Sequence, residues 1–301
     1  MPYAWTHILF GHELIQQAKL SPPQNRSFFQ LGCQGPDFFF FHRFWQFTKK
    51  KTGERLGNLF HTKNCGPVLV EFIEAAKTYA DLRDYVLGFI THYILDYSTH
   101  PYIHYRAGYK RFKHQELEVI IDTLIALELR NLKTWSTPLV PEIDIGHLPS
   151  HLVDIFWQIT HQYYSDGNQE WKRNHYDEAY QHMKKAFQLF FDPQGLKSFF
   201  TFGLIAPFRH KKNIPNRDYL NLKRENWTHP AIKEETYTDS FWDLWEAALQ
   251  DGKRILPRVV RYWETGEETR ESLLQLVGNR SYDHGKDCSL NLDNVLSDPI
   301  V

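Results

Sequence analysis

The sequence predicts an all-α protein. Apolar residues recur at intervals of three and four along most of the chain, which is the spacing of one buried face of an α-helix. No series of alternating apolar and polar residues separated by tight turns is present, so antiparallel strands are not expected. With 301 residues, 16% of them aromatic, the chain can form a well-packed globular core.

Helical periodicity predicts eight helices, of which residues 116–129 form the clearest amphipathic segment. We expect Asp239 or Ser240 to cap the helix that begins near Phe241. We expect the helix before Pro101 to end near His100, because a proline disfavours helical geometry at the residue that precedes it. The predicted helices are 7–20, 66–80, 83–100, 110–133, 149–164, 168–191, 238–250 and 252–264.

Three breaks separate these segments, near residues 21–26, 137–146 and 205–235. The last contains three prolines and predicts a long irregular connection. The helices on its two sides are too few for an independent second core, so we expect one domain over 1–301. The polar tail after residue 266 is expected to be partly loop.

Composition limits the partners and the compartment. The formal net charge is −1, without the basic excess that binding to a nucleic-acid backbone requires. Three cysteines without a C-x-x-C motif do not form a disulfide framework and fit a reducing compartment. No signal peptide and no apolar run of membrane-spanning length is evident. These features predict a cytoplasmic protein without a transmembrane segment.

Histidine and carboxylate side chains recur at helical spacing. His92 and Asp96 are four residues apart, His100 follows after four more, and His114 and Glu118 repeat the interval. Residues at i and i+4 lie on one face of a helix, so two such pairs on neighbouring helices could hold metal ions. About two such pairs are expected by chance in this composition. The pairs therefore need support from their context.

That support comes from the order of further candidates: T-H near the start, then G-P-D, an isolated histidine, H-x-x-x-D, His and H-x-x-x-E. This order resembles the bacterial zinc-dependent phospholipase C family, which shares an all-helical fold and a three-zinc site with the S1/P1-type nucleases. The start M-P-x-x-x-T-H and the motif H-x-x-x-D-x-x-x-H-P-Y resemble the shorter branch, which has no secretion signal. The motifs cover roughly residues 1–120. Weaker similarity extends through H-P-A-I-K-E-E-T-Y-T-D-S-F-W and G-N-R-S-Y-D-H-G.

The resemblance implies up to three zinc ions held by residues within 2–118. Asp96 would bridge two of them. Proline at position 2 normally permits removal of Met1, so Pro2 would present a terminal amine, the most easily deprotonated aliphatic amine of a chain. The implied ligands are Asp37, His61, His92 and Asp96 for one ion; His100, His114 and Glu118 for the second; and His7, Asp96 and the amine and carbonyl of Pro2 for the third.

Two assignments stay open. The secreted enzymes have a longer loop after the helix aspartate than the three residues between Asp96 and His100, so His104 is an alternative to His100. The interval between Asp37 and His61 is also long, which makes His42 a rival to His61.

The residue types suit phosphate-ester chemistry. Zinc binds imidazole nitrogen and carboxylate oxygen, and its catalytic sites leave a position for water. Three carboxylates would leave a charge of about +3 on three zinc ions, which favours an anionic phosphate ester. Metal binding lowers the pKa of water to about 7, and Asp37 is the candidate general base for that water, the alternative being a ligand only.

We therefore predict a zinc-dependent, phospholipase C-like hydrolase of phosphate esters in which metal-activated water attacks phosphorus. The substrate class includes phospholipid, with nucleic acid unlikely but not excluded. The alternatives are a non-catalytic zinc-binding protein and a nuclease-like phosphodiesterase. An HD-type phosphohydrolase is disfavoured because the chain has no His-Asp dipeptide, and a ferritin-like di-iron protein because it has no Glu-x-x-His.

The run 38–47 contains seven aromatic residues directly after Asp37. It predicts either core packing or an apolar wall at the mouth of the site that touches lipid. The neighbouring Lys49–Lys51 could favour an anionic surface, although exposed lysines are usually only solvated.

Overall fold

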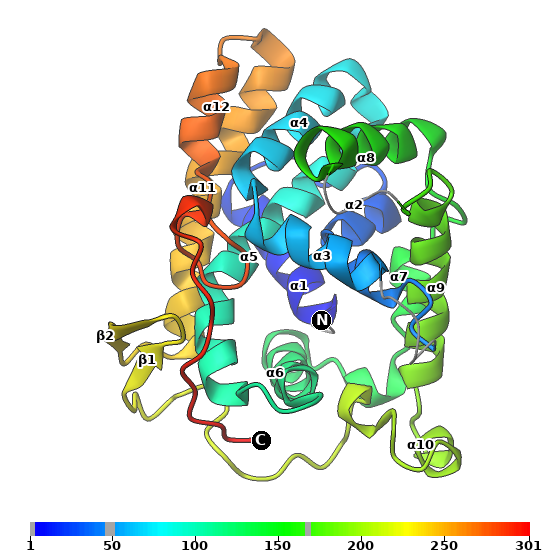
Figure 1. Cartoon of the computed structure of the whole chain (residues 1–301), viewed down its shortest axis with the longest axis vertical. Coiled ribbons are helices and arrows are strands. Elements are labelled where there is room, and N and C mark those ends of the chain that lie inside the picture. The colour runs from blue at the N-terminus through cyan, green and yellow to red at the C-terminus, as the bar shows by residue number, and fades with distance from the viewer. Residues whose placement is uncertain (1–3, 46–51, 166–169) are drawn as a thin grey trace.

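The computed structural model describes residues 4–45, 52–165 and 170–301 (Figure 1). Within these residues the fold is all-α, as predicted, apart from one two-stranded hairpin. The α-helices are α1 Ala4–Gln17, α2 Arg26–Gly32, α3 Thr52–Thr62, α4 Cys65–Thr78, α5 Arg83–Ala107, α6 Lys113–Arg130, α7 Val140–Ile143, α8 Ser150–Tyr163, α9 His175–Phe190, α10 Leu196–Phe200, α11 Phe241–Thr265 and α12 Arg270–Val277.

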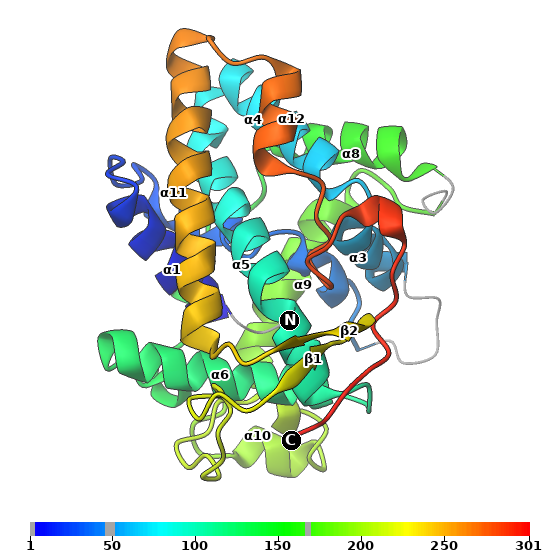
Figure 2. The ribbon, with the colours of Figure 1, turned by 90° about the vertical axis from the view of Figure 1, so that its left-hand side faces the viewer.

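Helix α5 is the centre of the fold. It contacts α1, α2, α4, α6 and α11, and most of its 25 residues are buried. Figure 2 shows α11 running alongside it. A helix covered on all sides must satisfy every polar side chain that it carries. The polar residues of α5 are therefore constrained by their surroundings.

The prediction that this helix ends near His100 is wrong, because α5 continues through Pro101 to Ala107. Proline lacks the N–H that would bond to the carbonyl of Tyr97. Gly285, in the loop after α12, passes so close to that carbonyl that a Cβ atom on it would lie 2.4 Å from the oxygen. Packing from several elements thus overrides the local preference, and His92, Asp96 and His100 stay on one continuous helix.

A second predicted boundary is also wrong. The two helices predicted at 238–250 and 252–264 form the single helix α11. Gly252 lies inside this helix. An interior glycine costs only about 1 kcal/mol, and packing against α5 and α1 offsets that cost. The predicted cap is confirmed at Ser240, whose side chain accepts from the backbone N–H of Asp243 while Asp243 bonds back.

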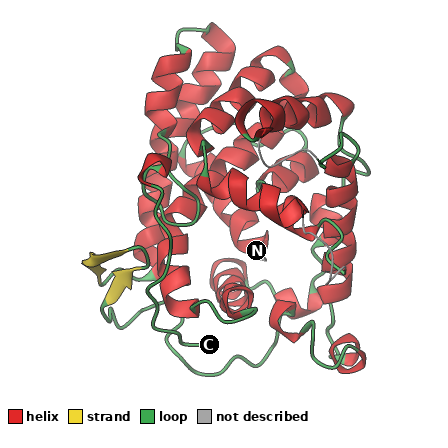
Figure 3. Ribbon diagram, viewed as in Figure 1, coloured by secondary structure: helices red, strands yellow, loops and turns green. Residues whose placement is uncertain are grey.

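Several elements were not predicted. They include helices α2, α3 and α12 and, within the break at 205–235, the hairpin of β1 Trp227–His229 and β2 Ile232–Tyr237. Figure 3 shows the hairpin at the edge of the helical body. After α12 the chain is mostly loop, as expected, and runs back along α5. None of the described helices combines the length and apolarity needed to cross a membrane.

The close approach of Gly285 to α5 gives a stability prediction. Gly285 has a φ of +69°, and Gly146 has a φ of +78° with no neighbouring atom within 4 Å of an added Cβ. We expect Gly146→Ala to lower the free energy of unfolding by about 1–2 kcal/mol through backbone strain alone. Gly285→Ala adds a clash with Tyr97 and should cost about 1–3 kcal/mol more. Urea unfolding measures both, and equal losses would contradict the packing described for the loop.

Candidate metal centre

The described residues that were predicted as zinc ligands gather in one buried cluster at the middle of the molecule. Five segments supply them: α1, the short 3₁₀ helix η1 Asp37–Phe41, α3, α5 and α6. Every side chain except those of Asp37 and His114 is nearly inaccessible to solvent. The members are His7, Asp37, His61, His92, Asp96, His100, His114 and Glu118.

One half of the cluster surrounds Asp37. Its Oδ1 atom lies 3.1 Å from Nε2 of His61 and 3.7 Å from Nε2 of His92. Nε2 of His92 is in turn 2.9 Å from Oδ2 of Asp96. These four side chains have ligand atoms close enough to share one metal ion.

The other half surrounds Glu118. Its Oε1 atom lies 2.7 Å from Nε2 of His114 and 3.4 Å from Nε2 of His100. Asp96 joins the two halves, because its Oδ1 atom is 3.6 Å from Nε2 of His100 and 3.1 Å from Nε2 of His7. The carboxylate of Asp96 therefore lies between the two halves of the cluster.

Backbone carbonyls orient three of the imidazoles. Nδ1 of His61 bonds to the carbonyl of Gly57 at 2.7 Å, that of His92 to Cys33 at 3.1 Å, and that of His100 to Tyr282 at 3.1 Å. A carbonyl only accepts, so each Nδ1 donates its proton and the neutral ring keeps a lone pair on Nε2. All three Nε2 atoms face the carboxylates, which is the arrangement typical of histidine ligands to zinc.

The geometry between His92 and Asp96 also fits a metal ion better than a hydrogen bond. Nε2 of His92 and Oδ2 of Asp96 are 2.9 Å apart, yet neither atom makes a well-oriented hydrogen bond within the described residues. Donor atoms that converge without bonding to each other are expected around a cation. Imidazole nitrogen and carboxylate oxygen are both ordinary zinc ligands.

The cluster favours added positive charge. Burial alone would raise the pKa of Asp96, but His100, His92 and His7 hold it well below its usual range. Burial would lower the pKa of His100, but the carboxylates of Asp96 and Glu118 raise it to about 10. Buried negative charges of this density need compensation by protons or by cations.

A model of the zinc-dependent phospholipase C family matches residues 6–189 of the chain. The chain belongs to this family. No curated protein and no solved structure matches it significantly. The matched part contains all eight clustered side chains, whereas the segments after α9 lie outside it.

The T-H motif has a structural explanation in this family member. The backbone N–H and the hydroxyl of Thr6 both donate to Oδ1 of Asp122 at 2.6 Å. Asp122 is fully buried on α6, one turn after Glu118. This pair ties the start of α1 to α6 and so directs His7, the next residue, into the cluster.

The G-P-D motif is explained by a close approach to α5. Gly35 has a φ of +52°, and a Cβ atom on it would lie 2.2 Å from the ring of His92. Only glycine lets the chain turn there without displacing that imidazole. The turn delivers Asp37, two residues later, to His61 and His92.

The loop after α12 completes the centre, although none of its residues was predicted to belong to the site. The backbone N–H of Tyr282 and the hydroxyl of Ser281 donate to the carbonyl of His61 at 2.9 and 3.0 Å. Asp283 points toward His104, with Oδ1 4.0 Å from its Nε2. Burial would raise the pKa of Asp283, but His104, helped by His61 and His100, lowers it to about 2. The motif G-N-R-S-Y-D-H-G was the available signal.

The two open ligand alternatives lie in different places. His104 neighbours the ring of His114, but its Nε2 faces Asp283 and it is not part of the cluster. His42 follows η1 and lies in a separate group beside Glu178 and His182. Nδ1 of His182 accepts the backbone N–H of Arg43 at 3.1 Å, so its Nε2 carries the proton and is not a metal ligand in that tautomer. The geometry favours His100 and His61.

The aromatic run mostly packs in the core. Phe38, Phe39 and Phe41 are buried, and Phe39 packs against Phe60 and Trp171. The interpretation of these three as a lipid-facing wall is therefore wrong. Because the run follows Asp37 directly, its burial anchors η1. Pro2, Gln46, Phe47 and Lys49–Lys51 lie outside the described residues.

The choice between His100 and His104 is testable by zinc content. The two residues occupy successive turns of α5, so alanine removes the same imidazole from the same helix. We expect His100→Ala to lose about one zinc ion per chain, because it removes one of three side chains around Glu118. His104→Ala should retain the wild-type content. Elemental analysis of gel-filtered protein measures this, with thermal melts as the folding control. The reverse pattern would assign the ligand to His104.

Proposed function

We propose that this family member is a zinc-dependent hydrolase of phosphate diesters, with phospholipase C-like chemistry. The observation that carries the proposal is the single connected cluster of three carboxylates and five imidazoles centred on Asp96. The family and the buried histidine and aspartate groups fit a metal-dependent phosphoesterase.

The proposed ligand sets follow the two halves of the cluster. Asp37, His61, His92 and Asp96 would hold one zinc, and the group around Glu118 would hold another. His7 and Asp96 would hold the third together with the amine and carbonyl of Pro2. Bound zinc would lower the pKa of water to about 7 and offset the charge of the phosphate.

The residues of the chain would then move the proton. In hydrolysis a water oxygen forms a bond to phosphorus, the bond from phosphorus to the leaving oxygen breaks, and that oxygen takes a proton. We propose Asp37 as the general base that accepts the proton of the attacking water. Its position supports this role, because its side chain is the most exposed of the three carboxylates and contacts His61 through Oδ1.

The role of Asp37 is tested by Asp37→Asn, which keeps the shape and removes the basic oxygen. With bis(p-nitrophenyl) phosphate as substrate, we expect kcat to fall by about 10²–10⁴-fold, the usual contribution of general-base catalysis. Zinc content, measured on the same sample, separates loss of the base from loss of a ligand.

The matched control is Asp154→Asn on α8, where the carboxylate forms a surface pair with Arg173. That change should leave kcat unchanged, since Asp154 is not part of the cluster and exposed ion pairs contribute little to stability. Wild-type kcat in Asp37→Asn would refute the proposed base. A zinc-loaded wild-type protein without turnover on any phosphodiester would favour the non-catalytic alternative.

A further inference from the structure

A protruding segment with exposed aromatic side chains lies outside the part that matches the family. We call residues 196–204, which comprise α10 and the turn after it, the apolar tip. Phe199, Phe200 and Phe202 are 76%, 74% and 96% exposed, and Leu196 and Leu204 are also exposed. Five large apolar side chains within nine residues form a patch, whereas the other exposed apolar residues of the described chain are scattered.

Hydrogen bonds fix the start of the apolar tip to the end of α9. The carboxylate of Asp192 accepts the backbone N–H groups of Lys197 and Ser198, at 3.1 and 2.8 Å. Nζ of Lys197 donates to the carbonyls of Gln188 and Phe191 at 2.7 and 2.8 Å. The phenylalanines are therefore presented to solvent by ordered structure.

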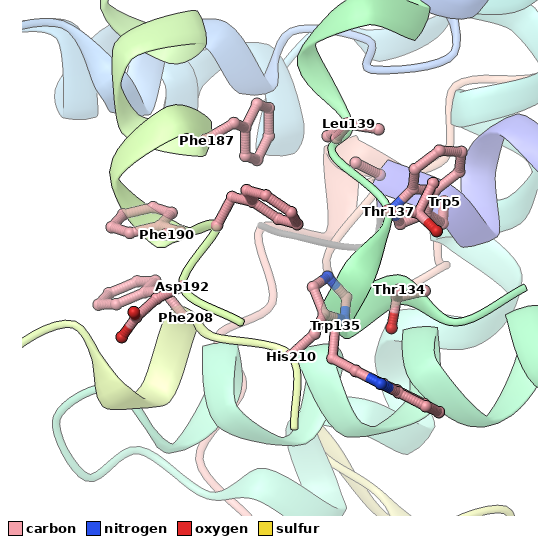
Figure 4. Close-up of a pocket in the computed structure, with 12 residues that line it drawn as sticks. Trp5, Thr134, Trp135, Thr137, Leu139, Phe187, Phe190, Asp192, Phe208 and His210 are labelled. Carbon is pink, nitrogen blue, oxygen red and sulfur yellow. The ribbon is translucent and has the colours of Figure 1, made fainter. Parts of the chain in front are cut away.

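Aromatic packing fixes this end of α9 to the body. The rings of Phe190 and Phe208 stack at 4.7 Å, beside a pocket that reaches Trp5 at the start of α1 (Figure 4). The pocket has a volume of about 30 Å³, which is room for a water molecule or two and not for an acyl chain. The apolar groups available to a ligand are thus those of the tip, and Figure 1 shows α10 projecting from one end of the molecule.

Charge distinguishes this region from the rest of the chain. Residues 193–217 contain five lysines and arginines and no aspartate or glutamate, although the whole chain has a net charge of −1. A cavity of about 240 Å³ adjoins the segment, and its lining includes Lys113, Arg209, Lys211 and Arg217. Its one acidic side chain, Glu116, is paired with Lys113 at 2.8 Å.

We infer that the apolar tip inserts into the surface of an anionic phospholipid bilayer, with the surrounding basic residues on the headgroups. A projecting cluster of phenylalanine and leucine beside a local excess of lysine and arginine is the composition of an interfacial anchor. The inference deepens the proposed function and rests on it for the choice of a lipid surface as partner. The tip would bring the enzyme to the membrane that holds its substrate.

Vesicle co-sedimentation tests the inference without needing turnover. The vesicles are pure phosphatidylcholine, or phosphatidylcholine with phosphatidylserine. We expect the full chain to bind the mixed vesicles, and the triple variant Phe199→Ser, Phe200→Ser, Phe202→Ser to bind at least about tenfold more weakly. The control variant Leu222→Ser, Val295→Ser removes two exposed apolar side chains elsewhere and should bind as wild type. Lys211→Gln, Lys212→Gln should weaken binding only to the anionic vesicles.

Turnover of bis(p-nitrophenyl) phosphate is measured on the same proteins and should be unchanged in the triple variant. Wild type and triple variant that bind vesicles equally, or a wild type that does not bind, would overturn the inference. Self-association abolished by the triple variant, without vesicle binding, would assign the tip to a second copy of the chain and also overturn it. Vesicle binding that depends on the tip, without phosphodiester turnover, would support the inference about the apolar tip and refute the proposed function.

Discussion

The buried carboxylate of Asp96 is the constraint on which the rest of the centre depends. It lies within 4 Å of His7, His92 and His100 on a helix that is covered on all sides. A charge in such a place is stable only if every lone pair has a partner. The imidazoles beside it come from α1, which supplies His7, and from α5 itself, which supplies His92 and His100. Asp37 in the G-P-D turn and Glu118 on α6 lie against the same imidazoles of His92 and His100. The helical body can therefore be understood as packing that brings these segments to one point.

The part of the chain after residue 189 contributes to the same centre although it lies outside the family match. The loop after α12 donates to the carbonyl of His61 and accepts from His100 through Tyr282. It also places Asp283 beside His104 at the edge of the cluster. Orientation of the imidazoles is thus shared between the matched helices and a distant loop. This dependence explains why the loop passes over α5 so closely that only Gly285 fits.

Part of the centre was predictable from helical spacing, whereas its remaining members were implied only by the order of motifs that the chain shares with the family. His92, Asp96 and His100 lie on one face of α5, and His114 and Glu118 on one face of α6, so local geometry suffices to pair them. The choice of His61 required α3, whose two glycines lower its intrinsic helix propensity. The continuation of α5 through Pro101, the role of Asp283 and the exposure of the apolar tip depend on contacts between distant segments. Periodicity carries no information about such contacts.

We propose that the cluster holds three zinc ions and that the N-terminus of the chain supplies ligands to the third. Native mass spectrometry of the protein with an unmodified N-terminus tests it directly, because one spectrum reports both the metal count and the loss of Met1. The account predicts three zinc ions on a chain that begins at Pro2. Zero or one metal ion, under conditions that do not strip metals, would contradict it and reduce the histidines and carboxylates to a structural network.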